Sequence, residues 1–488
     1  MNTLAQLNFD NTFARLPEHF YSRVHPMPLP HPYLVSFNNE ATDLIDLNSA
    51  EAQREDFVEY FSGNRLLPGS SPLAMLYAGH QFGHFVPQLG DGRAILLGEI
   101  KNKAGEYWDV QLKGAGITPY SRRGDGRAVL RSSIREYLCS EAMHGLGIPT
   151  TRSLCVVGSD ARVYRETTET AAVLTRLSPS HVRFGSFEVF YYRRQYTQIS
   201  ALADYVIARH FPEVTNAADQ YLQFLNTVIT RTAKLMAQWQ AVGFAHGVMN
   251  TDNMSILGLT FDYGPFGFME SYNPKYVCNH SDESGRYAFD QQPEIGYWNL
   301  SALAETLTPL IPEADLQYAL GNYSTIFNDT YITLMNQKLG LAQNNQDFSL
   351  AWSLLKLMRT SQVDYTNFFR ALSNFNAAPD EQNDQLRDQF IDREAFDRWA
   401  NEYRQHLKNE TASSQARSTQ MNKINPKYVL RNYLAQVAIE KAQQDRDFSE
   451  IDILLKLLRK PFDEQPDMAK YAAPAPDWAQ HIEVSCSS

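Results

Sequence analysis

The residues best suited to chemistry gather near the middle of the chain, between His246 and Gly264. Asn253 closes the run Asn250-Thr251-Asp252-Asn253, and Asp262 opens the triplet Asp262-Tyr263-Gly264. Asn and Asp offer the hard oxygen ligands that hold Mg²⁺ against phosphate oxygens. A simpler interpretation is an Asn- and Asp-rich turn that leads into a β-hairpin over 254–261, with Asp262 as a cap. The first interpretation predicts a site for a metal-bound nucleotide.

Protein kinases show a similar order of residues along the chain. Their catalytic segment has a His, then an Asn seven residues later, then an Asp-Phe-Gly-type triplet, and Asn253 follows His246 by seven residues. Kinases also pair a Lys on a small-lobe strand with a Glu on the next helix. Lys113 ends an alternating strand, and Glu136 lies on the helix that follows. Lys113 alone would be a solvated strand end, but the ordered series favours a nucleotide site.

Two glycine loops and two arginines add to this pattern. Gly90-Asp91-Gly92-Arg93 precedes a strand, and Gly124-Asp125-Gly126-Arg127 precedes a helix, whose free N–H groups favour an anion. Either loop could instead be a plain Asp-Gly turn. Arg176 lies in an apolar run, where a charge needs a partner, and Arg183 follows seven residues later. A buried triphosphate would explain so many cations.

One position departs from the kinase pattern. Kinases have their catalytic Asp two residues after the His, and that position is Val248, which accepts no proton. The chain is then either an inactive kinase that binds nucleotide or an enzyme with another base. Asp252 is the nearest carboxylate, although a turn would also account for it.

The elements that position these residues predict an α+β fold. A hairpin over 94–113, a helix over 127–144 and strands near 153–157, 161–165 and 171–177 form a strand-rich small lobe. Helical patterns follow over 221–242, 314–340, 349–373, 394–408, 427–444 and 450–459. The polar stretch 408–426 is predicted to be a flexible link. We expect an N-terminal extension (1–71), a kinase-like small lobe (72–190), a larger helical lobe (191–408) and a C-terminal helical extension with a tail (409–488).

Composition excludes several classes of protein. The 488 residues carry 44 basic and 55 acidic side chains, a net charge of −11, which argues against a general nucleic-acid partner. No run approaches the ~18 apolar residues of a membrane helix, and residues 1–15 match neither a signal nor a transit peptide. Four cysteines are too few to form a disulfide scaffold in a chain of this length. Such cysteine usage is typical of a reducing compartment, so we expect a cytoplasmic protein.

Several longer blocks resemble the selenoprotein O family of protein adenylyltransferases, whose fold is pseudokinase-like. The blocks are Asn11-Thr12-Phe13 with Leu16-Pro17, Tyr77 to Gly83, Gln88 to Ala94, Gln111 to Gly114, the segment 246–264, and Leu430-Arg431-Asn432-Tyr433-Leu434. The resemblance runs nearly end to end and is that of a bacterial member. It implies a bilobal kinase-like fold that holds ATP in reverse, with the γ-phosphate deep and the α-phosphorus facing the acceptor.

The resemblance also implies roles for matching positions. Asp252 would be the proton acceptor, and Asn253 and Asp262 would bind Mg²⁺ or Mn²⁺. Nucleotide contacts would come from Gly90, Gly92, Arg93, Lys113, Asp125, Gly126, Arg176, Arg183 and Asp262, with Glu136 as the ion-pair partner of Lys113. The implied activity is transfer of AMP from Mg-ATP to Ser, Thr or Tyr hydroxyls of proteins. The alternatives are an ordinary kinase, which Val248 disfavours, and a nucleotide-sensing scaffold, which the intact pair Asn253 and Asp262 disfavours.

The cysteines suggest a redox element. Many animal members of the family place selenocysteine third from the end, where this chain has Cys486. Cys139 and Cys155 lie in apolar elements and are expected to be inert. Cys278 lies sixteen residues after Asp262, where kinases keep a mobile activation segment. We therefore predict a regulatory disulfide between Cys278 and Cys486; the alternative is that the tail has no such role.

Overall fold

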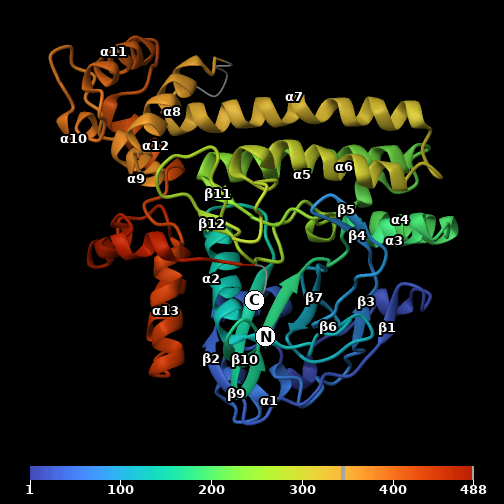
Figure 1. The fold of residues 1–488 in the computed structure, drawn as a ribbon. Helices are drawn as coiled ribbons and strands as arrows, with labels where there is room; N and C mark the ends of the chain where they lie inside the picture. Colours follow the sequence, from blue (N-terminus) through green and yellow to red (C-terminus); the bar gives the residue numbers. More distant parts are fainter. Residues whose placement is uncertain (342–346, 486–488) are drawn as a thin grey trace.

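The computed structural model describes residues 1–341 and 347–485 and has an α+β fold. An antiparallel sheet forms one end of the molecule, and long stacked helices form the other (Figure 1). This confirms the α+β class predicted from the sequence. None of the helices in the described ranges combines the length and the apolar character that crossing a bilayer requires.

The larger sheet has the strand order β1-β3-β6-β7-β10-β9-β2, and β8 pairs with β10. Its strands are β1 (Tyr21–Arg23), β2 (Tyr33–Phe37), β3 (Leu73–Met75), β6 (Ala94–Lys101), β7 (Tyr107–Lys113), β8 (Ala128–Val129), β9 (Arg152–Tyr164) and β10 (Thr168–Ser178). The predicted hairpin over 94–113 is confirmed as β6 and β7, which pair from Ala94 opposite Lys113 to Lys101 opposite Tyr107. Two smaller ladders join β4 (Gly79–Gln81) to β5 (His84–Val86) and β11 (Phe244–Ala245) to β12 (Gly267–Phe268).

Helices cover the sheet and build the other end of the molecule. The α-helices are α1 (Phe57–Phe61), α2 (Leu130–Gly145), α3 (Phe184–Tyr192), α4 (Tyr196–His210), α5 (Gln220–Val242), α6 (Gln292–Thr306), α7 (Glu313–Lys338), α8 (Ser349–Ser361), α9 (Tyr365–Leu372), α10 (Asp384–Arg387), α11 (Arg393–Lys408), α12 (Ser414–Ile424), α13 (Asn432–Gln444) and α14 (Ser449–Leu458). Short 3₁₀ helices are η1 (Leu4–Gln6), η2 (Phe13–Arg15), η3 (Asn39–Ile45), η4 (Ser49–Gln53), η5 (Pro212–Val214), η6 (Thr251–Asn253), η7 (Phe289–Gln291), η8 (Pro466–Ala472) and η9 (Asp477–His481).

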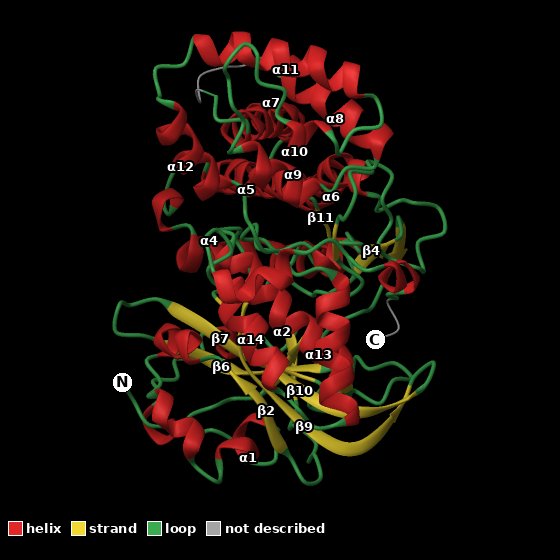
Figure 2. Cartoon of the chain, turned by 90° about the vertical axis from the view of Figure 1, so that its left-hand side faces the viewer, coloured by secondary structure: helices red, strands yellow, loops and turns green. Residues whose placement is uncertain are grey.

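Both ends of the chain contribute to the sheet region. The N-terminal strands β1 and β2 pair with β3 and β9 and so complete the two edges of the larger sheet. At the other end of the chain, α13 and α14 lie against α2, which itself packs on β9 and β10 (Figure 2). The helix that carries Glu136 is therefore enclosed between the sheet and the C-terminal helices.

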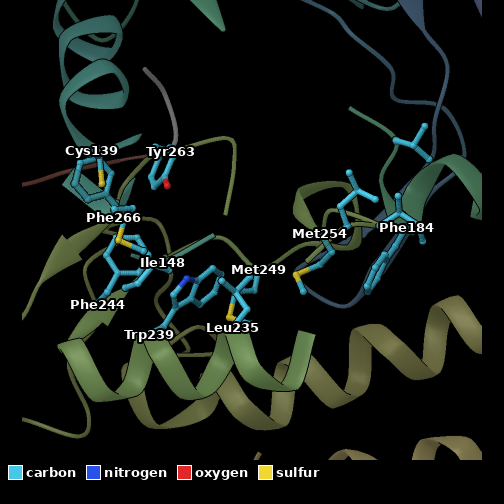
Figure 3. Packing of buried hydrophobic residues seen from close by; sticks show 14 of the residues in the cluster. Cys139, Ile148, Phe184, Leu235, Trp239, Phe244, Met249, Met254, Tyr263 and Phe266 are labelled. Atoms are coloured by element: carbon cyan, nitrogen blue, oxygen red, sulfur yellow. The ribbon is translucent and has the colours of Figure 1, made fainter. Parts of the chain in front are cut away.

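The long helix α5 supports the segment that begins at His246. It ends at Gly243, whose φ of 76° lies in the left-handed region that glycine adopts without strain. Beyond it, Met249 and Met254 join Leu235 and Trp239 of α5 in one buried cluster (Figure 3). Burying each such side chain contributes ~1.5–3 kcal/mol, so the intervening residues 250–253 are held on a rigid base.

Several strands predicted from the sequence differ from those in the structure. The three short strands expected over 153–177 are two long ones, β9 and β10. The hairpin expected over 254–261 is wrong, because its two halves bond to different segments. Ile256 N donates to Val182 O at 3.1 Å, and Thr260 N donates to Pro149 O at 2.8 Å. Local apolar pattern does not reveal such distant partners.

Two helical predictions also need correction. The single pattern over 349–373 is two helices, because Gln362 takes a left-handed φ of 51° and the Asp364 side chain then caps α9. The polar stretch 408–426 contains α12 instead of a continuous flexible link. Ser413 caps that helix by accepting from Ala416 N, and Arg417 is buried and donates to Phe375 O at 2.7 Å. Tertiary contacts thus order a segment whose composition resembles a loop.

Candidate active site

A cavity of about 520 Å³ lies between the sheet and the loop that follows α5. That volume is within the ~300–1,000 Å³ typical of small-ligand sites. It is lined by eleven residues that the sequence singled out: Gly90, Gly92, Arg93, Lys113, Asp125, Gly126, Arg176, Arg183, Asp252, Asn253 and Asp262. Residues up to 172 positions apart in the chain therefore meet in one place.

The sheet wall of the cavity is cationic. Lys113 and Arg176 come from the neighbouring central strands β7 and β10, where Leu174 lies opposite Lys113 and Arg176 lies opposite Gln111. Glu136 of α2 stands behind them, 2% exposed, and pairs with Lys113 and with Arg176, the latter at 3.1 Å. Lys113 and Glu136, which the sequence analysis expected to pair, form this ion pair. Arg176 also donates its Nε to Gln111 Oε1 at 3.0 Å.

Asp262 lies at the centre of the cations. It forms ion pairs with Arg176 and, at 2.7 Å, with Arg183, and Lys113 Nζ is 3.9 Å away. Burial alone would raise the pKa of Asp262, but these three cations outweigh it and hold the pKa well below the usual range. Asp262 also has a φ of 57°, which is strained for a residue with a side chain. The structure therefore keeps an ionised carboxylate fixed in the cavity.

Arg183 joins the two halves of the site. Its Nη1 donates to the backbone oxygen of Asp252 at 2.6 Å as well as to Asp262. Its guanidinium lies over the rings of Tyr77 and Phe261, 4.3 and 4.6 Å from their centroids. These two cation–π contacts restrict the orientation of the planar cation. An arginine so fixed is suited to contact a phosphate with a defined geometry.

The glycine loops approach the cavity through tight backbone packing. Gly90 has a φ of 112°, and a Cβ there would lie 2.5 Å from the Tyr120 ring. A Cβ on Gly126, at φ 69°, would lie 2.1 Å from the backbone of Gly116. Asp125 faces Arg165, which donates to both of its carboxylate oxygens at 2.9 Å. The side chain of Asp125 is thus engaged by an arginine that sequence analysis did not identify.

The loop after α5 presents Asp252 and Asn253 to the cavity. Burial raises the pKa of Asp252 to about 7, against the opposing effects of Arg183 and of a hydrogen bond from Gln81. Asn253 Nδ2 donates to Val248 O at 3.0 Å, and in the described part of the chain no hydrogen bond engages its Oδ1. Val248, at the kinase base position, lines the cavity with an apolar side chain.

His246 has a supporting role in this loop. Its ring is 1% exposed, stacks on Trp239 with centroids 5.3 Å apart, and bonds through Nε2 to Phe261 O at 3.0 Å. Burial lowers its pKa below the usual value. It therefore ties the start of the loop to the strand-like segment before Asp262 and does not reach the cavity.

Of the two cysteines predicted to pair, the structure describes only Cys278. Cys278 is buried, and its neighbourhood meets the end of the chain, because His280 N donates to Val484 O at 2.9 Å. Cys486 lies outside the described residues. Cys139 and Cys155 are fully buried, and burial raises both thiol pKa values, as expected of inert thiols.

Sequence analysis assigned no role in the site to several residues that line or support the cavity. They include Tyr77, Gln81, Gln111, Arg127 and Arg165. Gln111 was open to prediction, because it precedes Lys113 by two residues on the same polar face of a strand. Arg165 was not, because only the fold brings it to Asp125, forty residues away. Among the described residues, no three His, Cys, Asp or Glu side chains converge as a metal site, so Asn253 and Asp262 alone carry that expectation.

A fixed carboxylate among buried cations, beside a second carboxylate on a rigid loop, is a charge pattern that suits a phosphorylated ligand. The model of the family described as protein adenylyltransferase SelO matches residues 3–459. The "Protein nucleotidyltransferase YdiU" of Thiobacillus denitrificans is 59% identical over 488 residues, and that of Myxococcus xanthus is 55% identical over 489 residues. That of Stutzerimonas stutzeri is 52% identical over 490 residues, and each match covers 100% of both chains.

The chain belongs to the SelO family of protein adenylyltransferases. It is thus an enzyme of the nucleotidyltransferase class, and the resemblance drawn from its sequence is confirmed.

Proposed function

We propose that this enzyme transfers AMP from ATP to Ser, Thr or Tyr hydroxyls of proteins and releases pyrophosphate. The observation that carries the proposal is the convergence of Lys113, Arg176 and Arg183 in one cavity with Asp252. The cations suit a polyphosphate, and the carboxylate suits a hydroxyl proton. The expected absence of a nucleic-acid or membrane partner and the cytoplasmic location expected from the cysteines stay predictions.

The proposed architecture is kinase-like and bilobal. The strand-rich lobe (72–190) would carry Lys113 and Glu136, and the helical lobe (191–408) would carry Asp252, Asn253 and Asp262. The extensions 1–71 and 409–488 would complete the molecule. Support comes from the ordered series Lys113, Glu136, Asn253 and Asp262, whose members the fold brings to one cavity or directly behind it.

The nucleotide is proposed to bind with its γ-phosphate among the buried cations. Arg176 is 2% exposed and Arg183 is 2% exposed, so these two guanidinium groups lie deep in the site. With the γ-phosphate at these guanidinium groups, the α-phosphorus would lie farther toward the opening of the cavity and face the acceptor. This orientation exposes the bond between the α- and β-phosphates to the acceptor, whereas a kinase exposes the γ-phosphate.

The transfer breaks one bond and forms another. The acceptor oxygen attacks the α-phosphorus, the bond from that phosphorus to the bridging oxygen breaks, and pyrophosphate carries the electron pair away. Asp252 takes the hydroxyl proton, and its pKa of about 7 suits proton acceptance near neutral pH. Lys113, Arg176 and Arg183 offset the negative charge of the leaving group.

The donor set fits a divalent metal. Asp262 is ionised, and in the described structure Asn253 Oδ1 has no hydrogen bond, so both offer the hard oxygens that Mg²⁺ or Mn²⁺ prefers. When bound, such an ion supplies further charge to neutralise the phosphate oxygens. To serve as a ligand, Asp262 must share or release an arginine that it now holds.

The test uses ATP labelled on either the α- or the γ-phosphate, incubated with this enzyme and an acceptor protein. We expect the α-label to become bound to protein and the γ-label to leave as pyrophosphate. Protein-bound γ-label would instead show a kinase, for which Val248 provides no base. Absence of both labels from protein would show a nucleotide-binding scaffold and overturn the proposal.

A further inference from the structure

The hairpin of β4 and β5 (residues 79–86) lies directly against the loop that carries Asp252. His80 N donates to Thr251 Oγ1 at 2.7 Å, and Phe82 N donates to Asn250 Oδ1 at 3.1 Å. The other face of the hairpin is anchored by His80, whose Nδ1 lies 2.6 Å from Oε2 of the buried Glu188. Backbone groups and His80 therefore dock this hairpin, and the Gln81 side chain is not needed for docking.

Alternation along the strand directs Gln81 toward Asp252. Residues two apart in a strand point to the same face, so Gly79 and Gln81 share the face opposite to that of His80. A Cβ on Gly79 would lie 2.8 Å from Asp252 Oδ1, so the absence of a side chain lets the strand approach. Gln81 Nε2 then donates to Asp252 Oδ2 at 3.2 Å.

The two carboxylate oxygens of Asp252 consequently differ in their surroundings and in their hydrogen bonding. Oδ1 is enclosed beneath Gly79, and no hydrogen-bond partner reaches it among the described residues. Asp252 and Gln81 both line the cavity. Because Oδ1 is enclosed, a substrate hydroxyl can meet this carboxylate only through Oδ2, the oxygen that Gln81 already contacts. Oδ2 has a second lone pair, which remains available for the incoming proton.

We propose that Gln81 is a positioning residue for AMP transfer, which acts by holding Asp252 Oδ2 toward the acceptor hydroxyl. The inference rests on the proposed function, since it assumes that Asp252 accepts the proton. The terminal torsion of an Asp side chain has a broad, roughly two-fold preference, so the backbone alone does not fix the carboxylate plane. The Gln81 amide fixes it and takes no part in bond making. A misdirected carboxylate slows transfer without weakening the binding of ATP.

The experiment compares Gln81→Met and Gln81→Glu with the full-length wild-type enzyme, using α-labelled ATP and one acceptor protein. Both variants keep the length of the side chain, and both lose the amide donor. We expect kcat to fall by about 10- to 100-fold in each, as for loss of one hydrogen bond to a charged group. The dissociation constant for ATP, measured by calorimetry, should stay within about twofold in Gln81→Met, which adds no charge to the cavity. His84→Ala is the matched control, because His84 pairs with Gln81 across the hairpin and is exposed.

A double-mutant cycle separates positioning from a merely structural role. In an Asp252→Ala background, Gln81→Met should cause no further fall in the residual transfer rate, because its target is gone. The inference is overturned by wild-type kcat in both Gln81 variants, by a change confined to KM, or by an equal loss in the Asp252→Ala background. Should one variant fail to fold, as its melting temperature would show, the other gives the answer. A wild-type enzyme that transfers no α-label refutes the proposed function itself, which is a separate outcome.

Discussion

Replacing Asp262 by Asn should have opposite effects on catalysis and on the binding of metal-free ATP. In the free enzyme Asp262 forms ion pairs with Arg176 and Arg183, and the ammonium group of Lys113 is close by. These are the cations proposed to bind the phosphates, so the carboxylate and the nucleotide compete for them. Asp262→Asn keeps the shape of the side chain and removes the competing charge. It also removes the proposed metal ligand, so transfer should be lost.

The structure sets the expected magnitudes. Breaking a buried ion pair costs ~3–5 kcal/mol when the remaining charge is left alone. Here Arg176 keeps Glu136, and Arg183 keeps the Asp252 carbonyl, so we expect the free energy of unfolding of the free enzyme to fall by about 2–3 kcal/mol. Phosphates then supply the missing partners. Metal-free ATP should therefore bind to Asp262→Asn about tenfold tighter than it binds to the wild type, a difference of ~1.4 kcal/mol in binding free energy.

Calorimetry in the presence of a chelator measures the affinity, and thermal melting with and without ATP measures the stability. The melting temperature of Asp262→Asn should be lower without ATP and should rise more on ATP addition than in the wild type. Asp160→Asn is a control of equal charge, because Asp160 pairs with Arg446 on the surface. Equal or weaker binding of metal-free ATP to Asp262→Asn would refute the competition between carboxylate and phosphate.

Three further predictions follow from the same residues. Calorimetry should show that wild-type enzyme prefers ATP to AMP, and that Arg176→Ala and Arg183→Ala erase most of this preference; equal affinities in the wild type would rule out a deep γ-phosphate. Glu136→Gln takes the carboxylate from Lys113, while Arg176 keeps Asp262 and Gln111, so urea denaturation should show a loss of about 2–3 kcal/mol in the free energy of unfolding, and an unchanged midpoint would contradict this. Oxidised enzyme digested without reductant should yield linked peptides containing Cys278 and Cys486, with activity restored by reductant; unlinked peptides would exclude the switch.

The sequence predicts best those parts of the site that lie on regular elements. Alternation along 107–113 places Lys113 on the polar face of β7, and the helix that follows carries Glu136. Their pairing was predicted from the kinase-like order of the residues, and the structure contains this ion pair. Arg176 was recognisable because an apolar strand cannot hold an unpartnered charge. What local pattern could not supply is the identity of that partner: Asp262 comes from a loop 86 residues later.

Loops and their partners account for most of what the sequence could not predict. The segment 254–261 has strand-like composition, yet its backbone bonds go to residues near 150 and 182. Gln81 lies in a block that resembles the family, but its contact with Asp252 spans 171 residues and depends on Gly79. Such contacts follow from the topology, because segments distant in the chain meet at the cavity. Spacing within the chain carries no information about them.

Helix α13 is tied to the helix that carries Glu136, although it lies outside the cavity. Helix α2 carries Glu136 on the side of the buried cations, and the neighbouring Arg135 points to another part of the molecule. Arg135 donates to Phe266 O at 2.9 Å and to Asn432 Oδ1 at 3.3 Å. Phe266 belongs to the segment that follows Asp262, and Asn432 begins α13, so one arginine ties α2 to both. The position of Glu136 relative to Asp262 therefore depends on α13 as well as on the cavity residues.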